Sequence, residues 1–213
     1  PDLTGADPMP QLNGLRRVMT APLRHGYFIT EEMRRAPDAT PILLTSLGLS
    51  RCRVDSVQRI DAGGYPAIDI RFRAPGTGGK RVIYVSGNLS NSGFNGSFQS
   101  WLASFPSKSA YFKAASYLPH DPSFSKVRDW VLANCRSVLQ DDSGIPYRYY
   151  DSSNWNATLF GTYERPIPVF ARWRQADLAA AYDSIGGRGP EIPFGSGYHL
   201  KMSQANLQVY SRK

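Results

Sequence analysis

Two adjacent carboxylates are the most suggestive chemical feature of this sequence. Asp141 and Asp142 stand in the stretch QDDSGIPYR at 140–148, directly after the apolar pair Val138-Leu139. Neighbouring carboxylates can separate their pKa values, so that one acts as a base and the other as an acid. The alternative is a turn, because Asp accepts hydrogen bonds from the amides that follow it and Gly adopts a positive φ. Such a sequence more often forms a turn than a catalytic pair of carboxylates.

His120 is the third candidate for catalysis. An imidazole titrates near neutral pH and can therefore act as a general acid or base. However, His120 and Asp121 stand just before a segment with helical spacing, where an Asp is a typical N-cap. A catalytic site built from His120, Asp141 and Asp142 requires a fold that brings the three together.

A stretch of aromatic and basic residues supplies the candidates for ligand binding, which are Tyr147, Arg148, Tyr150, Trp155 and Arg165. Aromatic faces stack on sugars or bases, and Arg binds phosphate or carboxylate groups. Alternating aromatic residues are equally typical of a strand that faces a core, with Arg148 then pairing with an acid on the surface.

Several common signatures are missing. The chain lacks G-x-S-x-G, the P-loop pattern, H-E-x-x-H and a G-x-G-x-x-G after a strand. Its three His residues are far apart, and Cys52 and Cys135 are not in a C-x-x-C pair. We therefore expect no metal site and no cofactor. The two cysteines form either one disulfide or two buried thiols.

The charge balance favours an anionic partner only weakly. Among 213 residues, 25 are basic and 17 acidic, which gives a net charge of +8, and 19 of the basic residues are Arg. These cations are scattered, which is also typical of a solvated basic surface. An anionic small molecule, a glycan or a protein remains the expected partner. Nucleic acid is a weaker candidate because no RNA- or DNA-binding motif is present. No apolar run is long enough for a transmembrane segment.

The elements that must position these residues indicate an α+β fold. Residues 1–10 form a flexible lead-in, and residues 12–19, 30–33 and 41–47 have helical spacing. Strands are predicted at 54–60, 67–73 and 81–85 as an antiparallel meander, the middle one with a charged, solvated face. A hairpin is predicted from 138–140 and 147–150, further strands at 156–163 and 207–210, and helices at 124–134 and 177–185. Residues 11–213 are thus predicted to form a single α+β domain, mainly antiparallel in its sheets.

Four motifs occur in one order: KAASYL at 113–118, LQDDSGIPYR at 139–148, FGTY at 160–163 and PFGSGY at 193–198. In these the chain resembles a family of exported bacterial proteins without an assigned activity. The resemblance implies a bacterial source and a periplasmic or extracellular location. It also implies a further N-terminal α/β portion, so that these residues are part of a larger fold.

The sequence therefore predicts a non-enzymatic exported protein that binds an anionic or carbohydrate-like ligand or a protein partner. The alternative is a hydrolase or transferase that uses Asp141 and Asp142. Nucleic-acid binding is the weakest of the three hypotheses.

Overall fold

The computed structural model describes residues 47, 51–85, 87–106, 108–112, 115–164, 168–192 and 205–213. The chain divides into two compact units, Pro1–Asn88 with Gly93–Phe105, and Leu89–Ser92 with Pro106–Lys213. The single domain predicted for residues 11–213 stays a prediction. The lead-in and the predicted N-terminal helices lie outside the described residues, apart from the helical Leu47. Both helices and strands are present, which confirms the α+β class.

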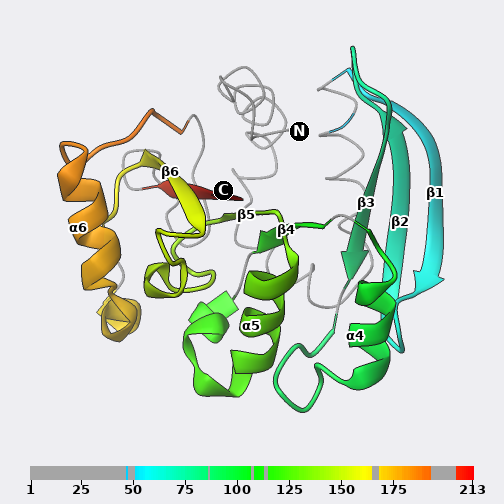
Figure 1. Ribbon diagram of the computed structural model, residues 1–213, viewed down its shortest axis with the longest axis horizontal. Helices are drawn as coiled ribbons and strands as arrows, with labels where there is room; N and C mark the ends of the chain where they lie inside the picture. The colour runs from blue at the N-terminus through cyan, green and yellow to red at the C-terminus, as the bar shows by residue number, and fades with distance from the viewer. Residues whose placement is uncertain are drawn as a thin grey trace. The chain divides into compact units, whose positions relative to one another are not determined.

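The first unit contains the predicted meander. Strands β1 (Arg53–Asp61), β2 (Pro66–Arg73) and β3 (Gly79–Val85) pair antiparallel in the order β1-β2-β3 (Figure 1). Alternate residues of β2 point to the same face, and this places Ile68, Ile70 and Phe72 in one apolar cluster. The short helix α4 (Gly96–Ala103) follows, capped by the Asn95 side chain, which accepts a hydrogen bond from the Phe98 amide.

The charged face of β2 differs from the prediction at Asp69. Arg71 and Arg73 are exposed as expected, but Asp69 is only 2% exposed. Arg81 of β3 donates two hydrogen bonds to its carboxylate, at 2.8 and 2.9 Å. The Phe105 ring lies 5.1 Å from the Arg81 guanidinium. The prediction of a solvated face is wrong at Asp69, because Arg81 binds its carboxylate in a fork-like pair that needs little water.

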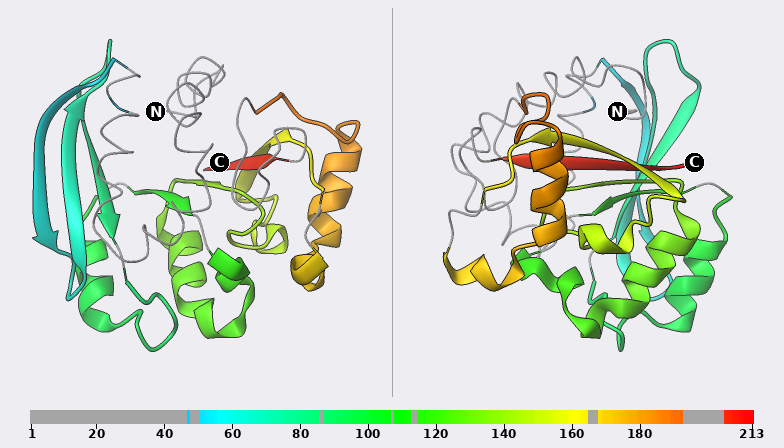
Figure 2. Two further views of the ribbon diagram at one scale, coloured as in Figure 1. Left: turned by 180° about the vertical axis from the view of Figure 1, so that it is seen from behind. Right: turned by 60° about the vertical axis from the view of Figure 1, so that its left-hand side comes forward.

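The second unit is built on a mixed sheet in the order β4-β5-β7-β6. Strands β4 (Ser109–Phe112) and β5 (Ser137–Gln140) are parallel, and helix α5 (Ser125–Asn134) lies between them in the chain. Parallel neighbours need such a crossover connection. Strand β7 (Asn206–Arg212) pairs antiparallel with β5 and with β6 (Trp155–Gly161). The right-hand view of Figure 2 shows β7, in red, between these neighbours.

Helix α6 (Ala176–Ser184) covers β6 (Figure 1). Leu178 and Tyr182 of α6 form one buried cluster with Leu159 of β6 and with Tyr163. The predicted strand at 156–163 and the helices at 124–134 and 177–185 are confirmed with small shifts at their ends. The closing strand predicted at 207–210 is confirmed as the centre of β7.

The predicted hairpin of 138–140 with 147–150 is wrong. Residues Tyr147–Tyr149 form a 3-10 helix, η3, and β5 pairs with β4 and β7 instead. The turn after β5 folds back onto the Gln140 side chain rather than onto a second strand. Three further 3-10 helices occur among the described residues, η1 (Ala115–His120), η2 (Pro122–Phe124) and η4 (Pro168–Trp173).

Cys52 belongs to the first unit and Cys135 to the second, and the choice between one disulfide and two buried thiols stays a prediction. Cys135 is buried, whereas Cys52 is only partly buried. Within the described ranges, no helix has the length and apolar character that crossing a membrane requires.

Candidate functional site

The loop after β5, residues 141–146, is held by the last side chain of that strand. Gln140 donates from Nε2 to the main-chain oxygen of Ile145 at 2.6 Å and accepts the Ile145 amide at Oε1 at 3.0 Å. The Tyr150 hydroxyl also donates to Oε1, at 3.0 Å. At position 144, a Cβ would lie 2.5 Å from Oε1, so Gly144 is required for this close approach. The buried Gln140 side chain therefore makes the hydrogen bonds to this loop that a second strand would make in a hairpin.

Strand β7 supplies the second support of this loop. Asn206, Gln208 and Tyr210 are alternate residues of the strand and so share one face. Asn206 Oδ1 accepts the Asp142 amide at 2.8 Å, and Gln208 Oε1 accepts the Tyr210 hydroxyl at 2.8 Å. All three side chains are fully buried. Polar groups at such depth need partners, and Asn206 Oδ1, the Gln208 amide and the Tyr210 hydroxyl find theirs in one another and in the loop.

The two aspartates of the loop have different surroundings. Asp141 accepts the amide and the hydroxyl of Ser143 within its own turn, the amide at 3.0 Å. Asp142 accepts the Tyr117 hydroxyl from η1 at 3.1 Å. Both aspartates are buried, at 4% and 1% exposure. Tyr117 has a φ of 57°, a left-handed conformation that costs a non-glycine residue about 1 kcal/mol. Such residues cluster at functional sites, and this one contacts the candidate pair.

His120 and Asp142 are neighbours, but through the main chain. His120 Nε2 lies 3.1 Å from the Asp142 carbonyl oxygen. Because a carbonyl oxygen only accepts, Nε2 is assigned the proton. Gln175 Nε2 donates to the same oxygen, also at 3.1 Å. The fold thus brings the candidate histidine to the candidate loop, and the contact orients the imidazole ring rather than pairing it with a carboxylate.

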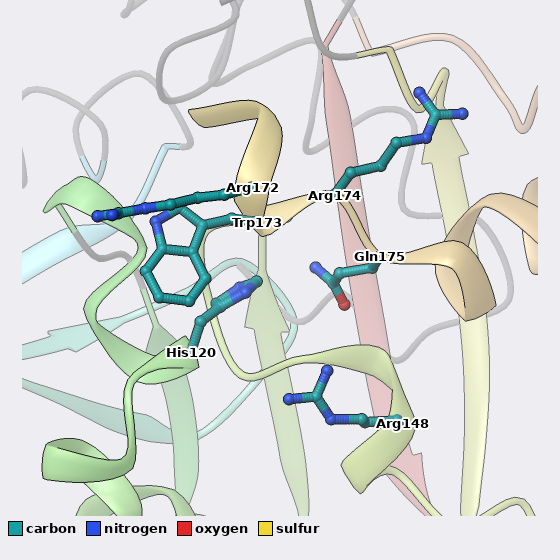
Figure 3. A pocket seen from close by; sticks show the side chains of 6 residues that line it. All are labelled: His120, Arg148, Arg172, Trp173, Arg174 and Gln175. Atoms are coloured by element: carbon teal, nitrogen blue, oxygen red, sulfur yellow. The ribbon is translucent and has the colours of Figure 1, made fainter. Parts of the chain in front are cut away.

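These two side chains form the floor of a cavity of about 170 Å³. We call it the basic cavity, and it is lined by His120, Arg148, Arg172, Trp173, Arg174 and Gln175 (Figure 3). His120 and Gln175 are 7% and 4% exposed, whereas the three arginines are exposed. In Figure 3 the Arg148 guanidinium points toward Gln175 and His120, and the Arg174 guanidinium points away from them. Arg148 is therefore the cation best placed to touch a ligand on this floor.

Among the described residues, no carboxylate lines the basic cavity. Arg148 and Arg174 form no ion pair with any described residue, and Arg172 stacks on Trp173 with 4.9 Å between guanidinium and ring centre. Asp121 has a lowered pKa, mainly because the Ser123 hydroxyl and amide donate to it and to a smaller extent because Arg172 is near. The cavity therefore carries an excess of positive charge. The hydrogen bond from the Ser123 amide also confirms Asp121 as a helix cap, here of η2.

The other predicted ligand-binding residues are dispersed. Tyr150 and Trp155 are 7% and 6% exposed and belong to the core, where Tyr150 stacks on Tyr210 with ring centres 3.5 Å apart. Burial raises the pKa of the Tyr150 hydroxyl. Tyr147 lines a different cavity, and Arg165 lies outside the described residues. Within the predicted aromatic and basic stretch, Arg148 is the described residue that reaches the basic cavity.

Sequence reasoning missed most of the cavity wall. Four residues of the wall are not among the sequence-based candidates for ligand binding: Arg172, Trp173, Arg174 and Gln175. They follow one another as cation, aromatic, cation and amide directly before a helix, and this order resembles the aromatic and basic pattern that indicated Arg148. Tyr117 was also missed, because a left-handed tyrosine has no signal in a single sequence.

Comparison of the chain with protein-family models, with curated proteins and with solved structures finds no match. Among the residues that the structure describes, no group of three or more His, Cys, Asp or Glu side chains is arranged to hold a metal ion.

Proposed function

We propose that this protein binds a small oxyanion, the phosphate or carboxylate group of a small molecule, in the basic cavity without converting it. One observation carries the proposal: three guanidinium groups and a histidine line a small cavity, and no carboxylate of the described part of the chain lines it with them. Guanidinium groups recognise such anions by paired, charge-assisted hydrogen bonds. An extracytoplasmic location, which the resemblance implies, belongs to the same proposal and is tested by fractionating cells that express the full-length gene product.

Each lining residue has a distinct expected role. Arg148 donates to the anion, since its guanidinium points toward the floor of the cavity. Gln175 and His120 each donate from Nε2 to the Asp142 carbonyl oxygen, and this holds them in place as the floor against which the anion lies. Arg172 and Arg174 attract the anion over a longer distance, and this attraction weakens as salt screens it. The Trp173 ring offers an apolar face to the body of a ligand.

The burial of the aspartates supports a binding function over a catalytic one. Neither Asp141 nor Asp142 lines the basic cavity, and both carboxylates accept hydrogen bonds from neighbouring side chains. A general acid or base has to come within hydrogen-bond reach of its substrate. Nucleic-acid binding is also less supported, because a single cavity of about 170 Å³ is smaller than the extended basic groove that a strand requires.

The test is calorimetric titration of the full chain with phosphate, sulfate and citrate at low ionic strength. We expect one or more of these anions to bind, and Arg148→Gln to weaken its binding about tenfold, as for the loss of a charged hydrogen bond at an exposed site. Arg174→Gln should have a smaller effect, because this guanidinium points away from the floor. Arg136→Gln is the matched control, since Arg136 is exposed in the same unit and does not line the cavity.

Equal affinities of the Arg148→Gln and Arg136→Gln variants would exclude the basic cavity as the site. Recovery of a phosphate monoester in hydrolysed form after incubation with the protein would instead contradict the absence of catalysis.

A further inference from the structure

A second cavity, of about 430 Å³, opens beside strand β6 and helix α6. We call it the apolar cavity, and its lining includes Tyr147, Ala157, Thr158, Leu159, Ile185 and Arg188. Its volume lies within the range of ligand pockets, about 300–1,000 Å³. The described residues that line it differ from those that line the basic cavity.

The wall of the apolar cavity is fixed by main-chain contacts. The Gly189 amide donates to Gly161 at 2.9 Å, and the Gly161 amide donates to Pro190 at 2.8 Å. A Cβ at position 189 would collide with the Leu159 carbonyl oxygen, so only glycine allows this segment to lie so close to β6. These contacts hold Arg188 at the end of β6, where its main chain pairs with that of Thr162 in an isolated antiparallel β-bridge. The cavity is a built feature of the fold and not a gap between mobile loops.

The lining combines an apolar body with one cation. Leu159, the Tyr147 ring and Ile185 offer apolar surface, and Ile185 is 47% exposed. The Arg188 guanidinium is exposed and forms no ion pair with a described residue. A complementary ligand has an apolar body and a single anionic head.

We infer that the apolar cavity binds a small monocarboxylic acid with an aromatic or branched aliphatic body. The carboxylate accepts the paired donors of Arg188, for which its planar geometry is suited. The body lies against the Tyr147 ring and covers Ile185, which removes exposed apolar surface from water. This site is separate from the proposed function, because a different arginine and a different wall form it.

The experiment uses phenylacetate and 4-methylpentanoate as probes, with saturation-transfer NMR to detect binding and titration to measure affinity. We expect the acids to bind at concentrations of about 10 mM or lower, and phenylacetamide to bind about tenfold more weakly because it lacks the charge. Arg188→Gln should weaken phenylacetate by a similar factor. Ala157→Phe should abolish binding, because the exposed Ala157 lies on the wall and an aromatic ring is tolerated in a strand while it fills the cavity.

Two further variants separate this site from the basic cavity. Arg136→Gln, at a residue that lines neither cavity, should bind phenylacetate as the unmodified protein does, and Arg148→Gln should weaken phenylacetate binding less than Arg188→Gln does, because Arg148 lines the basic cavity and not the apolar one. The inference is overturned if neither acid binds, if phenylacetamide binds as tightly as phenylacetate, or if Arg188→Gln leaves the affinity unchanged. Loss of binding in Arg148→Gln alone would assign the acids to the basic cavity and would also overturn it.

Discussion

Replacement of Gln140 by leucine tests whether the buried amide holds the loop that carries both aspartates. In the structure this amide, 1% exposed, bonds the N–H and C=O of Ile145 and the hydroxyl of Tyr150. Leucine has a similar size but no polar atoms, so all three groups lose this partner inside the protein. Each loss costs about 1.5 kcal/mol, and the added apolar surface of leucine recovers about 1 kcal/mol. We therefore expect Gln140→Leu to lower the free energy of unfolding by about 3.5 kcal/mol.

Two measurements read this effect. Urea denaturation gives the change in free energy of unfolding, and hydrogen exchange at the Ile145 amide reports the loop itself, because that amide donates to the Gln140 side chain. Gln99→Leu is the matched control. Gln99 is half-buried and its side chain donates one hydrogen bond, to the Phe94 carbonyl oxygen at 2.9 Å, so its replacement should cost about 1 kcal/mol or less.

If Gln140→Leu lowers the free energy of unfolding no more than Gln99→Leu does, and the Ile145 amide stays protected from hydrogen exchange, then other contacts hold the loop and the buried Gln140 side chain does not. If the variant is destabilised while Ile145 stays protected, the amide supports the core of the unit rather than the loop.

Asp69→Asn should lower stability by about 2 kcal/mol at neutral pH, a value reduced from that of a fully buried pair because Arg81 is 38% exposed. The two hydrogen bonds from Arg81 hold the pKa of Asp69 below its ordinary 3.8. The difference in free energy of unfolding between variant and unmodified protein, measured by urea denaturation, should therefore be constant above that pH and shrink as the pH falls below it. Burial raises the pKa of Cys135 to about 11. At pH 8 a disulfide reagent such as dithionitrobenzoate should therefore label the partly buried Cys52 much faster than the buried Cys135. Equal labelling rates would show that Cys135 is accessible to the reagent.

The parts of the fold that the sequence predicts well are those with local signals. The meander has short turns rich in Gly and apolar residues at every second position of β2, and both signals come from neighbours in the chain. Helix α6 likewise has an apolar face at helical spacing and ends before two glycines. The predicted hairpin after β5 is wrong because the strand that pairs with β5 is distant in the sequence. Strand β7 begins at Asn206, more than sixty residues after β5, and no local signal shows which strand pairs with β5.

The candidate site divides in the same way. The polar turn at 141–144 and Arg148 could be found from the residue types alone. Whether an aspartate faces solvent or the interior depends on its surroundings, here the Tyr117 hydroxyl and the Asn206 amide, which come from distant segments. A single sequence does not show such long-range partners, so it identifies the residues of the loop but not their orientation.

Asp142 connects the buried network to the basic cavity through three different groups. Its amide donates to Asn206, its carboxylate accepts from Tyr117, and its carbonyl oxygen accepts from both polar side chains of the cavity floor. A carbonyl oxygen fixed on both sides by buried contacts cannot move without breaking them, so His120 and Gln175 keep their positions whether or not a ligand is present. Rigid polar groups lose little entropy when an anion binds, and this favours affinity in a small cavity. The paired aspartates that first suggested acid–base chemistry thus have a physical role without it, since the second of them positions the floor on which the proposed anion rests.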